Sequence, residues 1–277
     1  MRHLLYTNFK IQNKMKINQL FLFLFVLYLF PIQGFCQEKD ENDKEFEEIR
    51  KNIPLGDVQE LETDIEFPVG GIVIKSTSEN AVKGIFRYKK ERWKPEIDFR
   101  KEEGMGYLKI EADREGKLRK HNRSDENLWG IMLSRDVDHV IDLELGAGKC
   151  KVDLEGCRVK EFEFSMGAGE AKINLRNTSL RELEVDAAVG EATVDLSGEW
   201  KNDLDAEIAG GMGEITLILP ADVGAKVDVS GILGEKRLPG FKKREGSYVN
   251  EQYGKTEHTL YIDITGGIGS VHIETRE

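Results

Sequence analysis

The sequence predicts an all-β fold, a β-solenoid in which coils of about 21 residues stack into two sheets, each coil holding two short strands. Three observations support this prediction. Glycines recur at a constant interval, as at Gly148, Gly169 and Gly190, apolar and polar residues alternate on both sides of them, and turn-like segments such as "LEGCR" separate the repeats. Alternation with period two is typical of a strand with one buried face. Because a single coil cannot bury its apolar faces, neighbouring coils must stack about 4.8 Å apart.

The chain of 277 residues begins with a predicted secretory signal peptide, residues 1–36. Lys14 and Lys16 precede an unbroken apolar run, and polar residues follow that run. The run covers residues 20–30 and is too short to span a bilayer as a helix, which needs roughly 20 residues. Met15 is an alternative start, since "MKINQLFLF" is by itself a complete opening of a signal peptide.

We expect cleavage before Gln37 and a protein located in the periplasm or at the cell surface. Lipidation of Cys36 is the alternative, and Phe35 disfavours it because a small residue is expected before a lipid-modified cysteine. Loss of residues 1–36 removes four lysines and arginines and no acids, so the net charge changes from −11 to −15. This charge argues against a nucleic-acid partner. It suits a cationic partner, a divalent ion or solubility alone.

The remaining chain is predicted to hold a tether and one β domain. Residues 37–56 are highly charged and poor in apolar residues, so we expect a flexible tether there. Residues 57–277 form the predicted solenoid. Its less regular part, residues 57–135, is expected to form β-hairpins that cap one end of the stack, and a polar excursion at residues 238–253 is expected to help cap it. Such caps are needed because open sheet edges pair with other chains.

Each predicted corner is a glycine. Two, four and six residues after Gly148 stand Cys150, Val152 and Leu154, all apolar, and the same columns follow the next three glycines. The chain must reverse sharply at these points, which favours a residue that tolerates positive φ. The expected corner glycines, including weaker early copies, are Gly70, Gly106, Gly148, Gly169, Gly190, Gly213, Gly234 and Gly269.

The glycine-rich "MGAGEAKINL" at residues 166–175 also prompts the hypothesis of a phosphate-binding loop. A dinucleotide fingerprint needs a glycine at the sixth position and a helix after it, but Lys172 stands there within a strand pattern. No Walker-type loop motif occurs in the sequence. Calcium-binding β-helices have a much shorter repeat, of about nine residues. We therefore interpret the motif as a structural corner and predict no cofactor.

Acidic residues recur six positions before the corner glycines, with the side chain pointing outward. The column comprises Asp142, Glu163, Glu184, Glu207, Asp228 and Asp263, and Asp64 occupies the same place in the first copy. Two interpretations stay open. Either the column keeps a sheet surface solvated and free of aggregation, or it forms a face for a ligand or partner.

Residues with catalytic or metal-binding potential are few. His121, His139, His258 and His272 show no metal-ligand spacing, and no G-x-S-x-G motif occurs. We predict no catalytic and no metal-binding residue. Cys150 and Cys157 do not make a disulfide framework. We expect one buried and one exposed thiol, with a disulfide between them as the alternative.

The motifs and their order resemble the toast-rack domain family. The resemblance rests on "VGGIVIK", "NLWGIMLSRDVDHVIDLELGAGKCKVDL", "GAGEAKINL", "LPADVGAKVDVSGILG", "GSYVNEQYG" and "IDITGGIGSVHI". It covers about residues 57–277. It implies a bacterial cell-envelope protein, since the domain is related to the C-terminal part of Lia-type envelope-stress regulators, and it transfers no catalytic residue.

We therefore expect a secreted, non-catalytic module of the cell envelope that acts in binding, adhesion or stress sensing through its acidic face. The partners it suggests are an envelope protein, a glycan or a divalent cation. The alternative is a carbohydrate-active enzyme, a polysaccharide lyase or hydrolase on a β-helix scaffold, because such enzymes use paired carboxylates. Two carboxylates beside an arginine or lysine in a deep groove would favour the enzyme, and a flat acidic face would favour the module.

Overall fold

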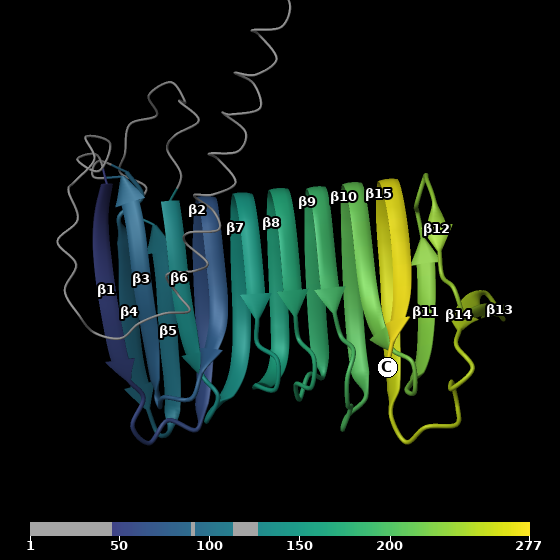
Figure 1. Ribbon diagram of the computed structural model, residues 1–277, viewed down its shortest axis with the longest axis horizontal. Coiled ribbons are helices and arrows are strands. Elements are labelled where there is room, and N and C mark those ends of the chain that lie inside the picture. Colours follow the sequence, from purple (N-terminus) through teal and green to yellow (C-terminus); the bar gives the residue numbers. More distant parts are fainter. Residues whose placement is uncertain (1–45, 90–91, 113–126) are drawn as a thin grey trace, which may run out of the picture. The chain divides into compact units, whose positions relative to one another are not determined.

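The alternating pattern of the sequence is realised as strands throughout the computed structural model, which describes residues 46–89, 92–112 and 127–277. In these ranges the chain forms 15 strands and no helix, and the strands belong to one mixed sheet (Figure 1). The strands are β1 (Phe46–Pro54), β2 (Glu60–Thr77), β3 (Ala81–Lys89), β4 (Pro95–Glu102), β5 (Met105–Ala112), β6 (Asn127–Ser134), β7 (Asp138–Asp153), β8 (Arg158–Asn174), β9 (Glu182–Asp195), β10 (Leu204–Pro220), β11 (Gly224–Ser230), β12 (Lys236–Arg237), β13 (Lys242–Arg244), β14 (Ser247–Val249) and β15 (Thr259–Arg276). The all-β prediction is confirmed.

Six long strands, β2, β7, β8, β9, β10 and β15, form the regular part of the sheet and pair in parallel. Gly148 of β7 lies opposite Gly169 of β8, which lies opposite Gly190 of β9, so the constant interval between the glycines is the register of the strands. We expected two short strands per repeat in two stacked sheets. The structure has one long strand per repeat, because the pairing continues across the glycine on both sides.

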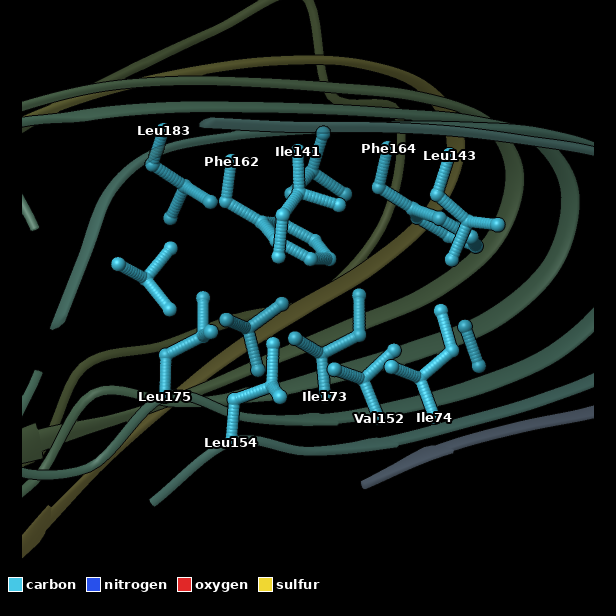
Figure 2. Close-up of a cluster of buried hydrophobic side chains, with 14 of the residues drawn as sticks. Ile74, Ile141, Leu143, Val152, Leu154, Phe162, Phe164, Ile173, Leu175 and Leu183 are labelled. Atoms are coloured by element: carbon cyan, nitrogen blue, oxygen red, sulfur yellow. The ribbon is translucent and has the colours of Figure 1, made fainter. Parts of the chain in front are cut away.

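The core lies between the two halves of these bent strands. Figure 2 shows Phe162, Phe164 and Leu143 from the first halves facing Ile173 and Val152 from the second halves. All five are at most 2% exposed. Each of these side chains thus packs against side chains from the other half of its own strand and from the neighbouring strands. This packing is expected for coils that cannot bury their apolar faces alone.

The corner glycines form a row in which neighbouring backbones nearly touch. Gly169 has a φ of +153°, and a Cβ added to it would lie 1.9 Å from the carbonyl oxygen of Gly148. No side chain fits there. In stack order the row contains Gly70, Gly148, Gly169, Gly190, Gly213, Gly269 and Gly234. The prediction of Gly106 as a corner is wrong, because that residue lies near the start of β5, opposite Leu61 and outside the glycine row.

The amino-terminal end of the stack is a split coil. The first half of β2 pairs with β5, which pairs with β4. The second half of β2 pairs with β6, β6 pairs with β3, and β3 pairs with β1. Trp129 fills the core here, with ring centroids 4.8 Å from Phe67 and 5.4 Å from Phe86. The predicted tether, residues 37–56, is wrong for its second half, since 46–54 is strand β1, and residues 37–45 lie outside the described residues. Ile49 and Ile53 pack on the core and tie this charged segment to β3.

At the other end, the last strand of the chain is not the last strand of the stack. β15 inserts between β10 and β11, so β11 and the short strands β12, β13 and β14 lie outside it. Residues 238–253 were expected to help cap the stack. They include β13 and β14, which extend the sheet beyond β11 at this end of the stack, in agreement with that prediction.

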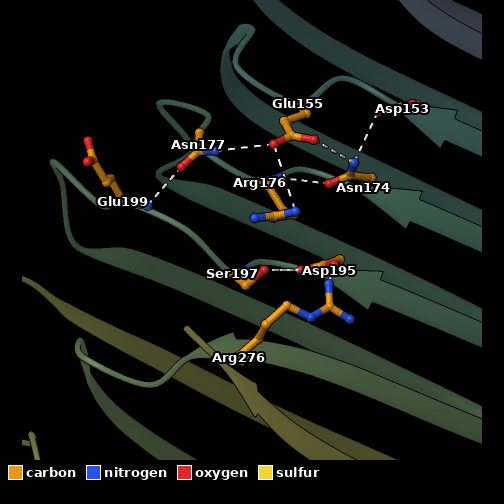
Figure 3. Close-up of polar contacts among 9 residues, drawn as sticks. All are labelled: Asp153, Glu155, Asn174, Arg176, Asn177, Asp195, Ser197, Glu199 and Arg276. Atoms are coloured by element: carbon orange, nitrogen blue, oxygen red, sulfur yellow. Dashed lines mark hydrogen bonds and ion pairs between the residues drawn. The ribbon is translucent and has the colours of Figure 1, made fainter.

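Polar side chains connect the turns that close successive coils (Figure 3). The Asn174 side-chain amide donates to Asp153 at 3.0 Å, and Asp195 accepts from the Ser197 hydroxyl at 2.6 Å. Arg276 of the last strand contacts Asp195 as an ion pair. Asn177 connects three successive turns, since its side-chain amide donates to Glu155 at 3.4 Å and its side-chain oxygen accepts from the Glu199 backbone N–H at 2.9 Å.

Both cysteines of the described ranges are free thiols and both are buried. The expectation of an exposed thiol is wrong for Cys157, because the turn that carries it packs against the core, and Cys157 is 1% exposed. Burial raises the pKa of Cys150 to about 12, so its thiol stays protonated and unreactive at neutral pH.

Candidate interaction face

The parallel register brings the predicted acidic column into one continuous row. Pairing aligns seven carboxylates on seven neighbouring strands. In stack order this acidic row contains Asp64, Asp142, Glu163, Glu184, Glu207, Asp263 and Asp228. Asp263 precedes Asp228 because β15 lies between β10 and β11 in the sheet. The order of the residues along the chain does not reveal this.

The acidic row has acidic neighbours on both sides, two positions along each strand. Glu66, Glu144 and Asp186 lie on the side of the bend, and Glu161, Glu182 and Asp205 lie on the other side. The sequence analysis did not single these residues out, although the same period-two alternation places them on the outer face. The acidic face is therefore three acids wide on β9 and two acids wide on β8 and β10, where Ser165 and Ala209 occupy the third position.

Ion pairs neutralise this row at its two ends. At the amino-terminal end, the Lys109 ammonium lies 2.9 Å from Asp64 and 2.9 Å from Glu66. At the other end, Lys226 lies 3.1 Å from Asp228. Between them, Glu163, Glu184 and Glu207 form no ion pair with a cation of the described ranges.

The side-chain pKa values reflect this distribution of charge. Burial raises the pKa of Asp142 above its ordinary value, and the negative charges of Glu163 and Asp64 raise it further. The pKa of Glu184 is also raised, by desolvation and then by Asp186, Glu163 and Glu207. A group whose charged form is disfavoured by like charges gains from a cation placed among them. The centre of the face is therefore suited to a positively charged partner.

The end of the row behaves in the opposite way. The pKa of Asp228 is lowered, mainly by a hydrogen bond from the Ser247 hydroxyl and then by Lys226. The Asp228 carboxylate therefore already has a hydrogen-bond donor and a cation as partners within the protein. The attractive part of the face for a partner is thus the interior of the row, over β8, β9 and β10.

The histidines do not assemble a reactive site. His139 is fully buried, with its Nε2 2.7 Å from the carbonyl oxygen of Ser134. His258 lies near Asp203 in the turn before β15, His272 lies near Glu214 in β15, and His121 lies outside the described residues. Among the residues that the structure describes, no group of three or more histidine, cysteine, aspartate or glutamate side chains could hold a metal ion. The same residues include no helix suited to crossing a membrane.

Comparisons with known proteins match one family and several solved structures. The family model described as the N-terminal domain of toast_rack, DUF2154, matches residues 39–179 and 161–218. A candidate cell adhesion protein from Clostridium sporogenes is similar at 26% identity with a TM-score of 0.63, over 84% of this chain and 100% of that chain. No curated protein matches the sequence.

More distant structures include two candidate adhesins. The one from Bacteroides fragilis is 12% identical, with a TM-score of 0.28 over 82% of this chain and 97% of that one. The one from Parabacteroides distasonis is 10% identical, with a TM-score of 0.27 over 81% and 97%. At these values the likeness carries no functional argument.

Proposed function

The chain belongs to the toast_rack family, and from this premise we propose that it is an exported, non-catalytic binding module of the cell envelope that acts in adhesion. The acidic face is the surface that we assign to the partner. The stacked, solenoid-like coils serve as a rigid scaffold that holds this face flat across neighbouring strands. Export rests on the predicted signal peptide, residues 1–36, which lies outside the described residues.

The observation that carries this proposal is the acidic row. Carboxylates directly opposite each other on paired strands destabilise a sheet. Six consecutive pairings in one row are nonetheless acid against acid, and the interior of the row forms no ion pair with a cation of the described residues. A basic partner would relieve this repulsion. The similarity to the candidate cell adhesion protein of C. sporogenes, which covers that whole chain, supports a role in adhesion.

The carbohydrate-active enzyme is less well supported. Lys109 lies beside two carboxylates, but all three side chains are on the outer surface of the sheet, and they are 41%, 42% and 27% exposed. Glycoside cleavage needs a carboxyl group with a raised pKa beside the scissile bond. Hydrogen bonds to Asp64 and Glu66 instead raise the pKa of Lys109, which keeps its ammonium charged. This cluster therefore suits an ion pair at the end of a sheet.

Neutralisation of the interior of the row tests the proposal. In the variant Asp142→Asn, Glu163→Gln, Glu184→Gln, Glu207→Gln, five like-charge pairings are lost, including those with Asp64 and Asp263, each with a cost of roughly 0.2–1 kcal/mol before screening. We expect a melting temperature a few degrees higher at low salt. Wild type should also be stabilised by a lysine-rich peptide, and this stabilisation should disappear in the variant.

A matched control removes the same charge elsewhere. The variant Glu96→Gln, Glu102→Gln, Glu103→Gln, Glu245→Gln neutralises four exposed acids outside the row. It should keep the response to the peptide. If the peptide does not shift the wild-type melting curve, or shifts both variants as it shifts wild type, the acidic row is a solvated surface and the proposed function fails.

A further inference from the structure

An exposed apolar ridge runs along the bend of the sheet. The residue directly before each corner glycine lies on the bend, and from β9 onward this residue is both large and exposed. In stack order the ridge contains Val189, Met212, Ile268 and Leu233, which are 41%, 54%, 63% and 73% exposed. Among the described residues these four and Tyr261 are the exposed large hydrophobic side chains, so four of five gather in one row. A patch of this kind marks an interaction site.

The core does not require the ridge. Two residues before each ridge position the side chain points inward, and there the chain has Ala187, Gly210 and Gly266. The space beside the two glycines is occupied by Ile215 and Ile232, since a Cβ on either glycine would meet one of these isoleucines. The interior of the bend is thus filled from other positions, and the ridge side chains project away from it.

A shallow groove of about 530 Å³ runs beside the ridge, between it and the acidic row. Small residues form its floor, among them Gly146, Gly167, Ala188 and Gly211, so backbone lies at the surface across β7, β8, β9 and β10. Glu144 and Asp186 stand in its lining. The groove and the ridge meet at β9 and β10, where Val189 and Met212 follow the groove residues Ala188 and Gly211 in sequence.

Carboxylates border the ridge on its other side as well. Glu191 of β9 lies opposite Glu214 of β10, and these residues follow Val189 and Met212 by two positions. Glu235 likewise follows Leu233 by two positions. Glu235 is held by Arg237 at 2.6 Å, whereas no described cation forms an ion pair with Glu191 or Glu214, apart from His272 at 3.6 Å from Glu214. Negative charge therefore flanks the ridge on both sides at β9, through Asp186 and Glu191, and on one side at β10, through Glu214.

We propose that the ridge and the adjoining groove bind an extended, basic amphipathic segment of a partner protein. Apolar side chains of the segment would cover the ridge, and its lysines or arginines would reach Asp186 and Glu144 on one side and Glu191 and Glu214 on the other. This inference rests on the proposed function and names the class of partner. Complementary charge favours it over a second copy of this chain or an anionic membrane, since both would bring negative charge against these carboxylates.

The probe is a peptide of eight alternating leucines and lysines. Six strands, from β7 to β10 and then β15 and β12, span about 24 Å, and eight extended residues reach about 26 Å. Binding to the full-length protein is measured by fluorescence anisotropy at low and physiological salt. We expect the variant Met212→Ser, Ile268→Ser to bind roughly 10-fold more weakly, because it loses the burial of two exposed apolar side chains. The matched control is Tyr261→Ser, which removes an exposed apolar residue outside the ridge and should bind as wild type.

Two further probes identify the source of binding. A peptide of alternating serine and lysine should bind weakly and equally to wild type and the ridge variant, and a peptide of alternating leucine and glutamate should not bind. Equal affinity of wild type and ridge variant for the leucine–lysine peptide would overturn this inference. If the acidic-row variant loses that affinity in the same experiment while the ridge variant keeps it, the proposed function stands without the ridge.

Self-association and membrane binding are the competing outcomes. Sedimentation of the protein alone, or with phosphatidylglycerol vesicles, should show no difference between wild type and the ridge variant. A dimer, or vesicle binding, that the ridge variant loses would assign the ridge to a second copy or to a membrane and would overturn the proposal. Melting curves check folding, and the ridge variant should be at least as stable as wild type, because its changes remove exposed apolar groups only.

Discussion

Replacement of Gly169 by alanine adds one methyl group within the crowded row of corner glycines. That Cβ would lie 1.9 Å from the carbonyl oxygen of Gly148, far inside contact distance, and the obstacle is backbone, not a flexible side chain. The φ of +153° adds strain, since residues with a Cβ avoid this region at a cost of about 1–3 kcal/mol. Relief of the clash also requires two paired strands to separate, which weakens their hydrogen bonds. We expect a total loss of at least about 3 kcal/mol.

The control for this prediction is Gly156→Ala. Gly156 also has a positive φ, +70°, but a Cβ there would meet nothing within 4 Å. It should lose about 1 kcal/mol from backbone strain alone. For a domain of this size about 1 kcal/mol corresponds to about 2–4 °C in melting temperature, so the two variants should differ by several degrees in a thermal melt. Equal melting temperatures for Gly169→Ala and Gly156→Ala would refute the argument that close strand approach demands glycine in the row.

Two more predictions concern register and pH. Deletion of residues 146–166 removes one whole coil and keeps every inward and outward assignment, so the protein should fold with lower stability. Deletion of residues 146–165 shifts the junction by one position and turns apolar faces to water, so it should abolish the cooperative melt. Similar circular dichroism melts for both deletions would contradict the register. Burial lowers the pKa of His139 below its ordinary value of 6.5, so its contribution to stability is complete above pH 6.5 and is lost as the pH falls through the lower folded-state pKa. Urea titrations between pH 7 and 5 should show this loss in wild type and a smaller one in His139→Gln.

The acidic row and the ridge together suggest how such a module could be selective. Charge attracts many basic partners and acts at long range, whereas apolar contacts require a matching spacing of side chains. A segment that carries only cations satisfies the acidic row alone. A segment with apolar residues between its cations would satisfy both surfaces, so the two sets of variants proposed above should separate general attraction from specific recognition.

Local patterns in the sequence determined the repeat, the inward and outward faces and the acidic column. They did so because strand alternation and glycine corners are properties of neighbouring residues, and because the equal intervals between Gly148, Gly169 and Gly190 place equivalent residues in register once the coils pair in parallel. The alignment of Asp142, Glu163 and Glu184 follows from this spacing alone. The burial of Cys150 follows as well, since it stands two residues after its corner glycine.

Only the tertiary structure decided what depends on pairing between distant segments. β15 takes the place between β10 and β11, which puts Asp263 before Asp228 and Ile268 beside Met212, and no local pattern distinguishes this order from the order along the chain. β1 joins the sheet although its sequence is mostly charged, because β3 offers an edge to its backbone and the core accepts Ile49. The exposure of the ridge has the same origin. From the sequence, an apolar residue between two glycines is interpreted only as part of the corner. In the structure Ile215 and Ile232 fill the space beneath the bend, so Met212 and Ile268 are left exposed to solvent.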